Sequence, residues 1–175
     1  MTIKPIITER FILRPYLMKD APQLAKLLNN RKVSRWMPFI PSPYHIKDAK
    51  ILINQMLAEQ KKSICTKIGL AIEIDHLLVG GLGMHRIEHG HKAEFGYWLG
   101  EAYWGQGIMT AVIREFCCFA FREFRLKRLF AYTYLDNCAS ERVLIKNGFE
   151  KEGTLRKVIR KGNRYKDCHL YARVI

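Results

Sequence analysis

The sequence predicts a mixed α/β (α+β) fold, in which helices flank a sheet of parallel and antiparallel strands. The first observation is the order of segments with strand and helix periodicity, which runs βααβββαβαββ along the chain. Strands and helices alternate in the second half, whereas the first half contains a meander of strands. The second observation is that 175 residues of 49% hydrophobic composition are enough to form one core. We therefore expect a single domain over residues 1–175.

The beginning of the chain predicts a strand followed by a helix. Apolar and polar side chains alternate from Ile7 to Pro15, which is typical of a strand. Asp20 is expected to cap the helix, with Gln23 as its capping-box partner, and the helix should end near Asn29-Asn30. Basic residues and prolines from Arg31 to Pro43 favour a short helical turn and then an irregular loop.

A second helix and a hairpin should follow. Apolar residues recur at helical spacing from Ile46 to Gln60. Two strands, Ile64 to Ile74 and Leu77 to Arg86, are joined by the polar pair Asp75-His76, which favours a tight turn. Three glycines in the second strand indicate a bulge or a close approach of another backbone: Gly80, Gly81 and Gly83.

The second half is built around the stretch from Ala93 to Phe124, which reads as strand, glycine turn and helix, the helix running from about Met109. A strand from Leu129 to Leu135 and a helix from Cys138 to Asn147 follow. Gly148 stands where a left-handed helix cap is usual. Two last strands are expected at about Phe149–Arg160 and Arg164–Val174.

Composition bounds the compartment and the partners. No apolar run is long enough to span a membrane, and the N-terminus has no apolar core of a secretion signal. The cysteines are five and include no C-x-x-C pair. These observations predict a soluble, cytoplasmic protein with no membrane partner. The net charge of +14 favours polyanionic partners, such as nucleic acid, a phosphate-rich cofactor or an acidic protein segment.

The glycine turn is a candidate anion site. The first turn of a helix has backbone N–H groups without internal partners at the positive end of the helix dipole, and glycine lets a phosphate approach them closely. This predicts a phosphate or pyrophosphate seat from Gly105 to Thr110. The alternative is a tight turn that needs glycine for conformational reasons alone. The turn contains neither the lysine of a Walker loop nor the third glycine of a dinucleotide fingerprint.

Three segments together resemble the GNAT superfamily of N-acetyltransferases, in the branch of the ribosomal-protein N-terminal acetyltransferases. These segments are E-F-G-Y-W-L at Glu94–Leu99, Y-W-G-Q-G-I-M-T at Tyr103–Thr110 and N-C-A-S-E-R-V-L-I-K-N-G-F at Asn137–Phe149. The resemblance covers essentially the whole chain. It implies the GNAT fold, with a mostly antiparallel sheet of six to seven strands, a splayed strand pair and four flanking helices. Trp104 and Met109 depart from the broad family pattern at the two ends of the loop.

The resemblance implies acetyl-CoA as co-substrate. The loop from Trp104 to Thr110 would wrap the pyrophosphate, the strand before it would hold the pantetheine arm, and Asn137 would contact that arm. The implied cofactor residues are Tyr97, Trp98, Leu99, Trp104, Gly105, Gln106, Gly107, Ile108, Met109, Thr110 and Asn137. An amide near Leu99 would stabilise the oxyanion. For Tyr97 and Trp98 the alternative is ordinary strand packing, and for Asn137 it is a helix cap.

Catalytic roles are implied for two residues. Glu94 is the first candidate for the base that deprotonates the acceptor amine, and Glu73 is the reserve. Ser140 would protonate the departing thiolate. The alternatives are solvated carboxylates and a first-turn serine. Holding the two reactants together supplies much of the rate in such a reaction, so removal of the base need not abolish activity.

Histidines and basic residues elsewhere in the chain determine whether we expect a metal ion or an acidic acceptor. His85, His89 and His91 lack the spacing and partners of a zinc site, so we expect no metal. Basic residues crowd the last hairpin, and three more follow the first helix: Arg156, Lys157, Arg160, Lys161, Arg164 and Lys166, with Arg31, Lys32 and Arg35. In the resembling family these segments border the acceptor groove, so we expect an acidic acceptor or assembly, although such a charge run is often only a solvated face.

The function expected is acetyl transfer to a primary amine, most simply the α-amine of a protein or peptide, in a ternary complex. One alternative acceptor is a small molecule such as a polyamine, an aminoglycoside or an amino acid. An alternative from another class is a basic ribosome- or RNA-binding module with little catalysis, although no RNA-binding motif is present. Ribosome association is conceivable for either class, and the sequence leaves both a monomer and a homodimer open.

Overall fold

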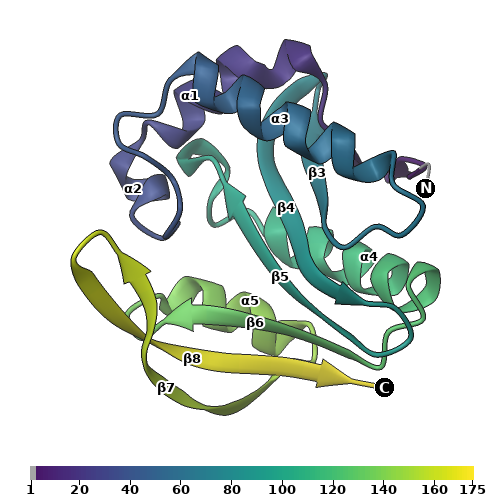
Figure 1. Ribbon diagram of the computed structural model, residues 1–175, viewed down its shortest axis with the longest axis vertical. Coiled ribbons are helices and arrows are strands. Elements are labelled where there is room, and N and C mark those ends of the chain that lie inside the picture. The colour runs from purple at the N-terminus through teal and green to yellow at the C-terminus, as the bar shows by residue number, and fades with distance from the viewer. Residues whose placement is uncertain (1–2) are drawn as a thin grey trace.

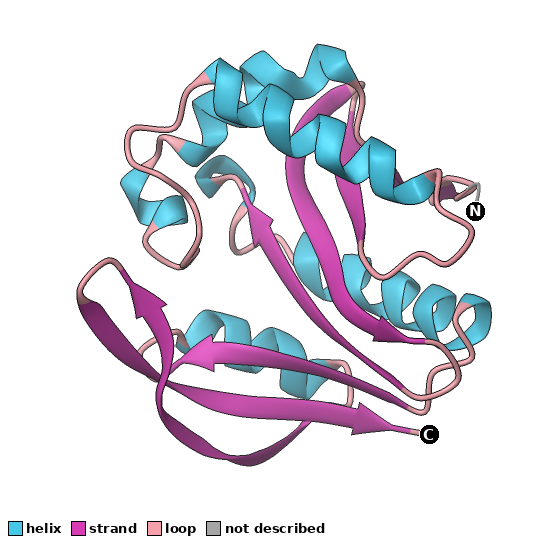
Figure 2. Ribbon diagram, in the orientation of Figure 1, coloured by secondary structure: helices cyan, strands magenta, loops and turns pink. Residues whose placement is uncertain are grey.

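The structure, a computed structural model, describes residues 3–175 as one eight-stranded sheet with helices on both faces (Figure 1 and Figure 2). The strand order is β1-β2-β3-β4-β5-β6-β8-β7. The strands are β1 (Ile6–Ile7), β2 (Ile12–Pro15), β3 (Ile68–Ile74), β4 (Leu77–Glu88), β5 (Lys92–Leu99), β6 (Arg128–Tyr134), β7 (Glu150–Lys161) and β8 (Arg164–Val174). The α-helices are α1 (Ala21–Leu28), α2 (Arg31–Ser34), α3 (Ile46–Gln60), α4 (Ile108–Glu123) and α5 (Cys138–Lys146).

The mixed, mostly antiparallel sheet with flanking helices is confirmed, but residues 3–175 form eight strands instead of six to seven, and five α-helices instead of four. The extra strand arises because the segment expected as one strand turns back on itself. Thr8 and Phe11 close the turn, since Thr8 N–H donates to the Phe11 carbonyl at 3.0 Å and the Phe11 N–H donates to Thr8 Oγ1 at 3.0 Å. Thr8, Glu9 and Arg10 are three consecutive polar residues, so the alternation expected for this segment does not continue through the turn.

The first helix departs from the prediction at its beginning. Asp20 precedes α1, but its side chain makes no cap bond to the helix. Its carboxylate instead accepts from the Leu17 N–H at 2.8 Å and from the guanidinium of Arg14. Gln23 donates to the carbonyl of Leu78 at 3.3 Å, so the expected capping box does not form. A charged partner on β2 binds the carboxylate more strongly than a neutral amide would.

The two faces of the sheet carry separate apolar clusters. Helices α1 and α3 cover one face through a cluster that includes Leu24, Leu28 and Ile53. Helix α4 packs on the opposite face, where Phe116 and Ile113 are fully buried. On α4 Cys117 is buried and Cys118 is exposed, as expected for adjacent positions on a helix.

The hairpin between β3 and β4 forms at the predicted turn, with left-handed backbone at both Asp75 and His76 (φ 48° and 62°). The register shifts by one residue in β4 opposite Ile72, which is the bulge that the glycines indicated. Gly81 marks a close approach, because a Cβ there would lie 1.9 Å from the hydroxyl oxygen of Tyr16.

Strands β5 and β6 form a parallel pair that separates after its first residues. Only residues 92–94 of β5 pair with residues 128–130 of β6, although β5 continues to Leu99. Figure 1 shows the two strands diverging beyond that point. The backbone groups of the later part of β5 that face β6 therefore have no strand partner on that side, and this is the splayed pair that the sequence led us to expect.

Two further observations concern the whole described chain. Across residues 3–175 no helix is long and apolar enough to cross a membrane. The five cysteines are all free thiols.

Candidate functional site

The divergence of β5 from β6 brings three sequence-predicted segments to one side of the sheet: the end of β5, the beginning of α4 and the beginning of α5 (Figure 1). The side chains at the end of β5 point alternately to the two faces. Tyr97 and Leu99 belong to the α4 cluster, whereas Trp98 packs against the α1 cluster. The backbone of β5, more than its aromatic side chains, therefore borders the gap.

The loop before α4 has the form of an anion cradle. Gly105 and Gly107 are both left-handed, with φ 75° and 72°, and a Cβ at either would meet no atom within 4 Å. Residues 104–107 are exposed. Within the described chain, the N–H groups of residues 105–110 donate to no backbone or side-chain acceptor, and the first bond of this region runs from Ala111 to the Gly107 carbonyl. Successive free amides at the positive end of a helix favour an anion.

Side chains hold the ends of this loop in place. The indole of Trp104 donates to the Leu99 carbonyl at 2.7 Å, which ties the loop to β5. Gln106 donates to the Ala102 carbonyl at 2.9 Å, and Arg10 donates to the Gln106 carbonyl at 3.1 Å. The helix begins at Ile108, one residue before the predicted start, and the side chain of Met109 in its first turn is buried. Both residues that depart from the broad family pattern have structural roles. Trp104 ties the loop to β5, and Met109 is a buried residue of the first turn of α4.

The beginning of α5 is joined to β5 across the divergence. The side chain of Asn137 caps the helix by accepting from the Ser140 N–H at 3.2 Å. The hydroxyl of Tyr97 lies 2.6 Å from Ser140 Oγ and 3.2 Å from the Ser140 carbonyl oxygen. Burial raises the pKa of Tyr97, so this hydroxyl keeps its proton at neutral pH. Ser140 therefore has a neutral hydrogen-bond partner beside the gap.

Glu94 lies at the point where the two strands part, opposite Phe130 of β6 and His85 of β4. Burial raises the pKa of Glu94, and the positive charge of Arg86 opposes this shift. Arg86 Nη1 lies 2.8 Å from Glu94 Oε2, but outside hydrogen-bonding direction. A half-buried carboxylate with a raised pKa beside the gap is suited to accept a proton near neutral pH. Arg86, which sequence reasoning did not single out, has left-handed backbone at φ 51°.

Glu73, the reserve base, is bound elsewhere. Its side chain is buried and its Oε2 accepts from Arg14 Nε at 2.5 Å. The same guanidinium binds both carboxylate oxygens of Asp20, at 2.7 and 2.9 Å. Glu73 therefore completes a buried ion-pair network between β2, β3 and the turn before α1. Its carboxylate is held by Arg14 inside the fold, whereas Glu94 lies where β5 and β6 part.

The α2 region meets the C-terminal half of the chain beside the gap. Lys161, at the end of β7, donates to the carbonyls of Ser34 and Met37, at 3.1 Å each. The ring of Trp36 lies 6.2 Å from that of Tyr134 between centroids. Figure 1 shows the tip of the β7–β8 hairpin reaching toward α2. These contacts connect the two segments that the resemblance assigned to the acceptor groove.

Basic side chains are concentrated on this side. The exposed ones over residues 156–166 of the hairpin are Arg156, Lys157, Arg160, Arg164 and Lys166. Two of the α2 cations are partly neutralised, because Lys32 pairs with Glu101 at 2.5 Å and Arg35 lies 3.8 Å from Asp136. Over residues 156–167 the hairpin has one carboxylate, Asp167, and it keeps most of its positive charge there.

The three histidines near β4 do not contact one another in the described structure. His89 contacts the Cys65 carbonyl at 3.0 Å, and His91 contacts Glu88 at 3.0 Å. Burial lowers the pKa of His85. No group of three or more metal-ligating side chains occurs among the residues that the structure describes.

Known acetyltransferases resemble this chain in sequence and fold. Residues 10–150 match the family model described as acetyltransferase (GNAT) domain. The uncharacterized N-acetyltransferase YoaA of Bacillus subtilis (strain 168) is 30% identical over 170 residues, which are 96% of each chain. The ribosomal-protein-serine acetyltransferase of Escherichia coli (strain K12) is 36% identical over 99 residues, 56% of this chain and 55% of that one. The crystal structure of the microcin C7 self immunity acetyltransferase MccE, in complex with acetyl-CoA and AMP, has a TM-score of 0.86 at 25% identity, covering 96% of this chain and 94% of that chain.

Proposed function

The chain belongs to the GNAT acetyltransferase family and is an acetyl-CoA-dependent N-acetyltransferase, and from this premise we propose that its acceptor is the α-amine of an acidic protein or peptide. The observation that carries the proposal is the opening between β5 and β6, with free loop amides following β5 and the basic β7–β8 hairpin beside β6. The amides suit a pyrophosphate, and the hairpin suits an acidic chain.

The proposed cofactor site is based on the backbone N–H groups of the loop that have no hydrogen-bond acceptor. We propose that the amides of residues 105–110 bind the pyrophosphate of acetyl-CoA, and that the pantetheine arm lies along the free edge of β5 from Tyr97 to Leu99, beside Asn137. The structure of MccE in complex with acetyl-CoA supports acetyl-CoA as the acetyl donor of this chain. Because these contacts come mainly from the main chain, Trp104 and Met109 are compatible with them.

The reaction proposed is direct attack in a ternary complex. Glu94 takes a proton from the acceptor ammonium, directly or through water, and the neutral nitrogen attacks the thioester carbonyl carbon. A backbone N–H near Leu99 stabilises the oxyanion. The C–S bond then breaks, and the thiolate takes a proton from the hydroxyl of Ser140. The nitrogen, positively charged since the attack, loses its extra proton, and this proton restores the Ser140 hydroxyl directly or through water. The products are the acetylated amine and free coenzyme A.

The acidic character of the acceptor rests on charge. The net charge is +14, and the hairpin cations lie beside the proposed acceptor side. A polyamine would be repelled by this surface, whereas an acidic polypeptide would be attracted to it. The E. coli relative is named for a ribosomal protein, which supports a protein acceptor and is compatible with ribosome association. The free cysteines fit the cytoplasmic location that the sequence predicts.

The test combines binding and transfer. Calorimetry with coenzyme A and a free-thiol assay with acetyl-CoA would use matched acidic and neutral peptides, spermidine, and an aminoglycoside as acceptors. We expect micromolar binding of the coenzyme, faster transfer to acidic peptides and a preference that declines as salt rises. Equal rates and equal salt response for both peptides would refute the acidic acceptor. Transfer to the small amines alone would refute the polypeptide acceptor, and RNA gel shift without any transfer would favour the binding module.

A further inference from the structure

Two glycines lie opposite each other in the middle of the sheet, beside the candidate base. Gly83 of β4 pairs with Gly96 of β5, and two residues along the same strands His85 pairs with Glu94. Side chains two residues apart on a strand share a face, so these four positions form one patch, which we call the glycine floor. Phe95, which alternates with them, belongs to the cluster that packs on α4. The glycine floor is therefore on the opposite face of the sheet.

The glycine floor is open at Gly96. This residue is exposed although β5 lies between β4 and β6, and a Cβ added to it would meet no atom within 4 Å. Glycine inside a strand weakens the strand and often marks a place where a ligand or another backbone approaches closely. Within residues 3–175 nothing approaches the Cβ position of Gly96. The open space is therefore available to a molecule from outside the chain.

The imidazole of His85 leans over the other glycine. A Cβ added to Gly83 would lie 2.8 Å from Nε2 and 3.2 Å from Cε1 of that ring, so the ring lies along β4 and above the floor. His85 is half-buried, and neither ring nitrogen makes a hydrogen bond within the described chain. Neither is among the buried polar atoms that lack a partner, so both nitrogens keep contact with solvent.

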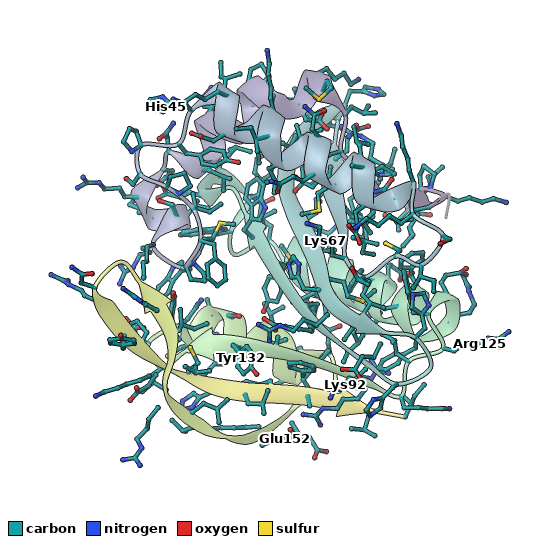
Figure 3. The ribbon with its side chains drawn as sticks, viewed as in Figure 1. His45, Lys67, Lys92, Arg125, Tyr132 and Glu152 are labelled. Atoms are coloured by element: carbon teal, nitrogen blue, oxygen red, sulfur yellow. The ribbon has the colours of Figure 1, made fainter. Side chains whose placement is uncertain are left out.

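Charged groups around the floor keep this imidazole neutral. Burial lowers the pKa of His85, and the positive charges of Lys67 and Arg86 lower it further. Lys67, next to the beginning of β3, and Tyr132, on β6, mark the two sides of the floor (Figure 3). A neutral imidazole has one accepting nitrogen, and with the proton on Nδ1 the acceptor is Nε2. The same two cations also favour the neutral form of an amine bound beside His85.

The carboxylate of Glu94 is the second acceptor at this place. Its side chain is 21% exposed although its Oε2 is buried near Arg86. Directly opposite residues on antiparallel strands have Cβ atoms about 5 Å apart, so the side chains of Glu94 and His85 are neighbours. One small group with several N–H donors can therefore contact both.

We propose that the nitrogen of the acceptor amine lies over Gly96, between Glu94 and His85, and that Nε2 of His85 accepts a hydrogen bond from it. The proposal rests on the reaction proposed above, in which Glu94 takes one proton of the ammonium. His85 holds a second N–H, takes no proton itself, and so fixes the direction of the lone pair that forms. Gly96 directly precedes Tyr97, where the proposed path of the pantetheine arm begins. His85 is thus a specificity-determining residue for a primary amine.

The chain offers a way to move the imidazole without removing it. A methyl group at Gly83 would meet the ring of His85, which is the movable end of a side chain, so Gly83→Ala should displace the ring and keep the strand. Gly96→Ala instead adds a methyl group to the open part of the floor, where it meets nothing in the chain. His91, exposed in the turn between β4 and β5, is the matched control for loss of an imidazole.

The experiment measures steady-state acetyl transfer at neutral pH to the best acceptor of the wild type, with calorimetry of coenzyme A and Tm for every variant. His85→Phe should raise the acceptor KM about threefold to tenfold, the value of one hydrogen bond, and leave the KM for acetyl-CoA within about twofold. His85→Gln retains an acceptor in place of Nε2 and should restore the acceptor KM to within about twofold of the wild type. Gly83→Ala and Gly96→Ala should raise the acceptor KM as His85→Phe does, and His91→Phe should not.

Three results would overturn the inference. A wild-type acceptor KM in folded His85→Phe would show that the imidazole does not contact the amine. An equal loss in His85→Gln and His85→Phe would show that the ring acts by packing and not as a hydrogen-bond acceptor. A wild-type acceptor KM in Gly96→Ala would show that the amine lies elsewhere. If the best acceptor is a small amine, the polypeptide acceptor of the proposed function fails, while the same variants, measured with that amine, still decide the role of His85.

Discussion

The hydroxyl of Tyr97 and that of Ser140 lie 2.6 Å apart and connect β5 to the beginning of α5 across the place where β5 and β6 separate. Tyr97 is also within 3.2 Å of the Ser140 carbonyl oxygen. When Tyr97 donates to Ser140 Oγ, the proton of Ser140 is free to be donated into the gap. The two residues thus link strand geometry to the proton that the proposed reaction delivers to the thiolate.

This pair gives the first prediction. Ser140→Ala removes the proposed proton donor and should lower kcat by up to about 10²-fold. Tyr97→Phe removes only its hydrogen-bond partner and should lower kcat by about threefold to tenfold. Steady-state kinetics with saturating acetyl-CoA would check both, with Tyr44→Phe as the control for loss of a buried tyrosine hydroxyl. A wild-type kcat in Ser140→Ala would remove Ser140 from the mechanism.

The second prediction concerns pH. Burial raises the pKa of Glu94, so as pH falls this carboxylate is protonated, and can no longer act as a base, at a higher pH than an ordinary glutamate. As pH falls through that raised pKa, kcat/KM should fall, which gives the pH profile an acid limb. Glu94→Gln should remove this acid limb and lower kcat/KM on the plateau above it about 10²-fold. Arg86→Gln removes an opposing positive charge 2.8 Å away, so the limb should move to higher pH.

One peptide must be used throughout this pH series, because its own amine titrates in every variant. Arg86 acts here as a positioning residue, and its effect should appear in the pH profile more than in the plateau. An unchanged acid limb in Glu94→Gln would show that another group or water accepts the proton. The raised pKa has a second consequence: folding favours the protonated form of Glu94, so Glu94→Gln should not reduce stability at neutral pH.

The third prediction contrasts the two carboxylates. Glu73→Gln weakens the buried network around Arg14 and should cost about 1–3 kcal/mol of unfolding free energy, because a charged partner of a buried guanidinium is lost. It should leave kcat within about twofold. Glu94→Gln should have the opposite pattern, with reduced kcat and retained stability. Urea unfolding and kinetics on both proteins provide the comparison, and a large loss of kcat in a folded Glu73→Gln would restore Glu73 as a base.

The fourth prediction tests the anion seat. Gly107→Ala places a methyl group on a left-handed residue, at a conformational cost of about 1 kcal/mol, and directs it into the open space before α4. We expect the Kd for coenzyme A to rise about tenfold or more. Gly90 is the matched control, since it has φ 77° and no atom within 4 Å of an added Cβ, but lies between β4 and β5 away from the loop. Calorimetry should find similar stability loss in both variants and weaker coenzyme binding only in Gly107→Ala; equal affinities would argue against the seat.

Much of the fold could be predicted from local patterns. Helical spacing located α3, α4 and α5 within one or two residues of their ends, and Asp75-His76 gave the correct turn between β3 and β4. These features depend on side-chain periodicity and on backbone preferences of a few neighbouring residues. The turn at Thr8 to Phe11 was missed because the segment was interpreted as one alternating strand, although Thr8, Glu9 and Arg10 are consecutive polar residues.

Part of the candidate site could also be predicted from local patterns, and part could not. The glycine spacing at Gly105 and Gly107 was enough to indicate a cradle of amides, because positive φ at these positions is a local property. By contrast, Glu73 and Glu94 are both single carboxylates on predicted strands, and nothing nearby in the sequence separates them. Their difference comes from Arg14, which lies 59 residues from Glu73 in the chain and binds it at 2.5 Å.

The sequence by itself therefore determined the elements, the anion loop and the family to which the chain belongs. Only the tertiary structure decided which carboxylate lies where β5 and β6 part, that Tyr97 reaches Ser140, and that the hydroxyl of Tyr134 has no partner within the described chain. The physical reason is that periodicity and turn preferences act over a few residues, whereas burial and pairing of a polar group depend on side chains that folding brings together from distant strands.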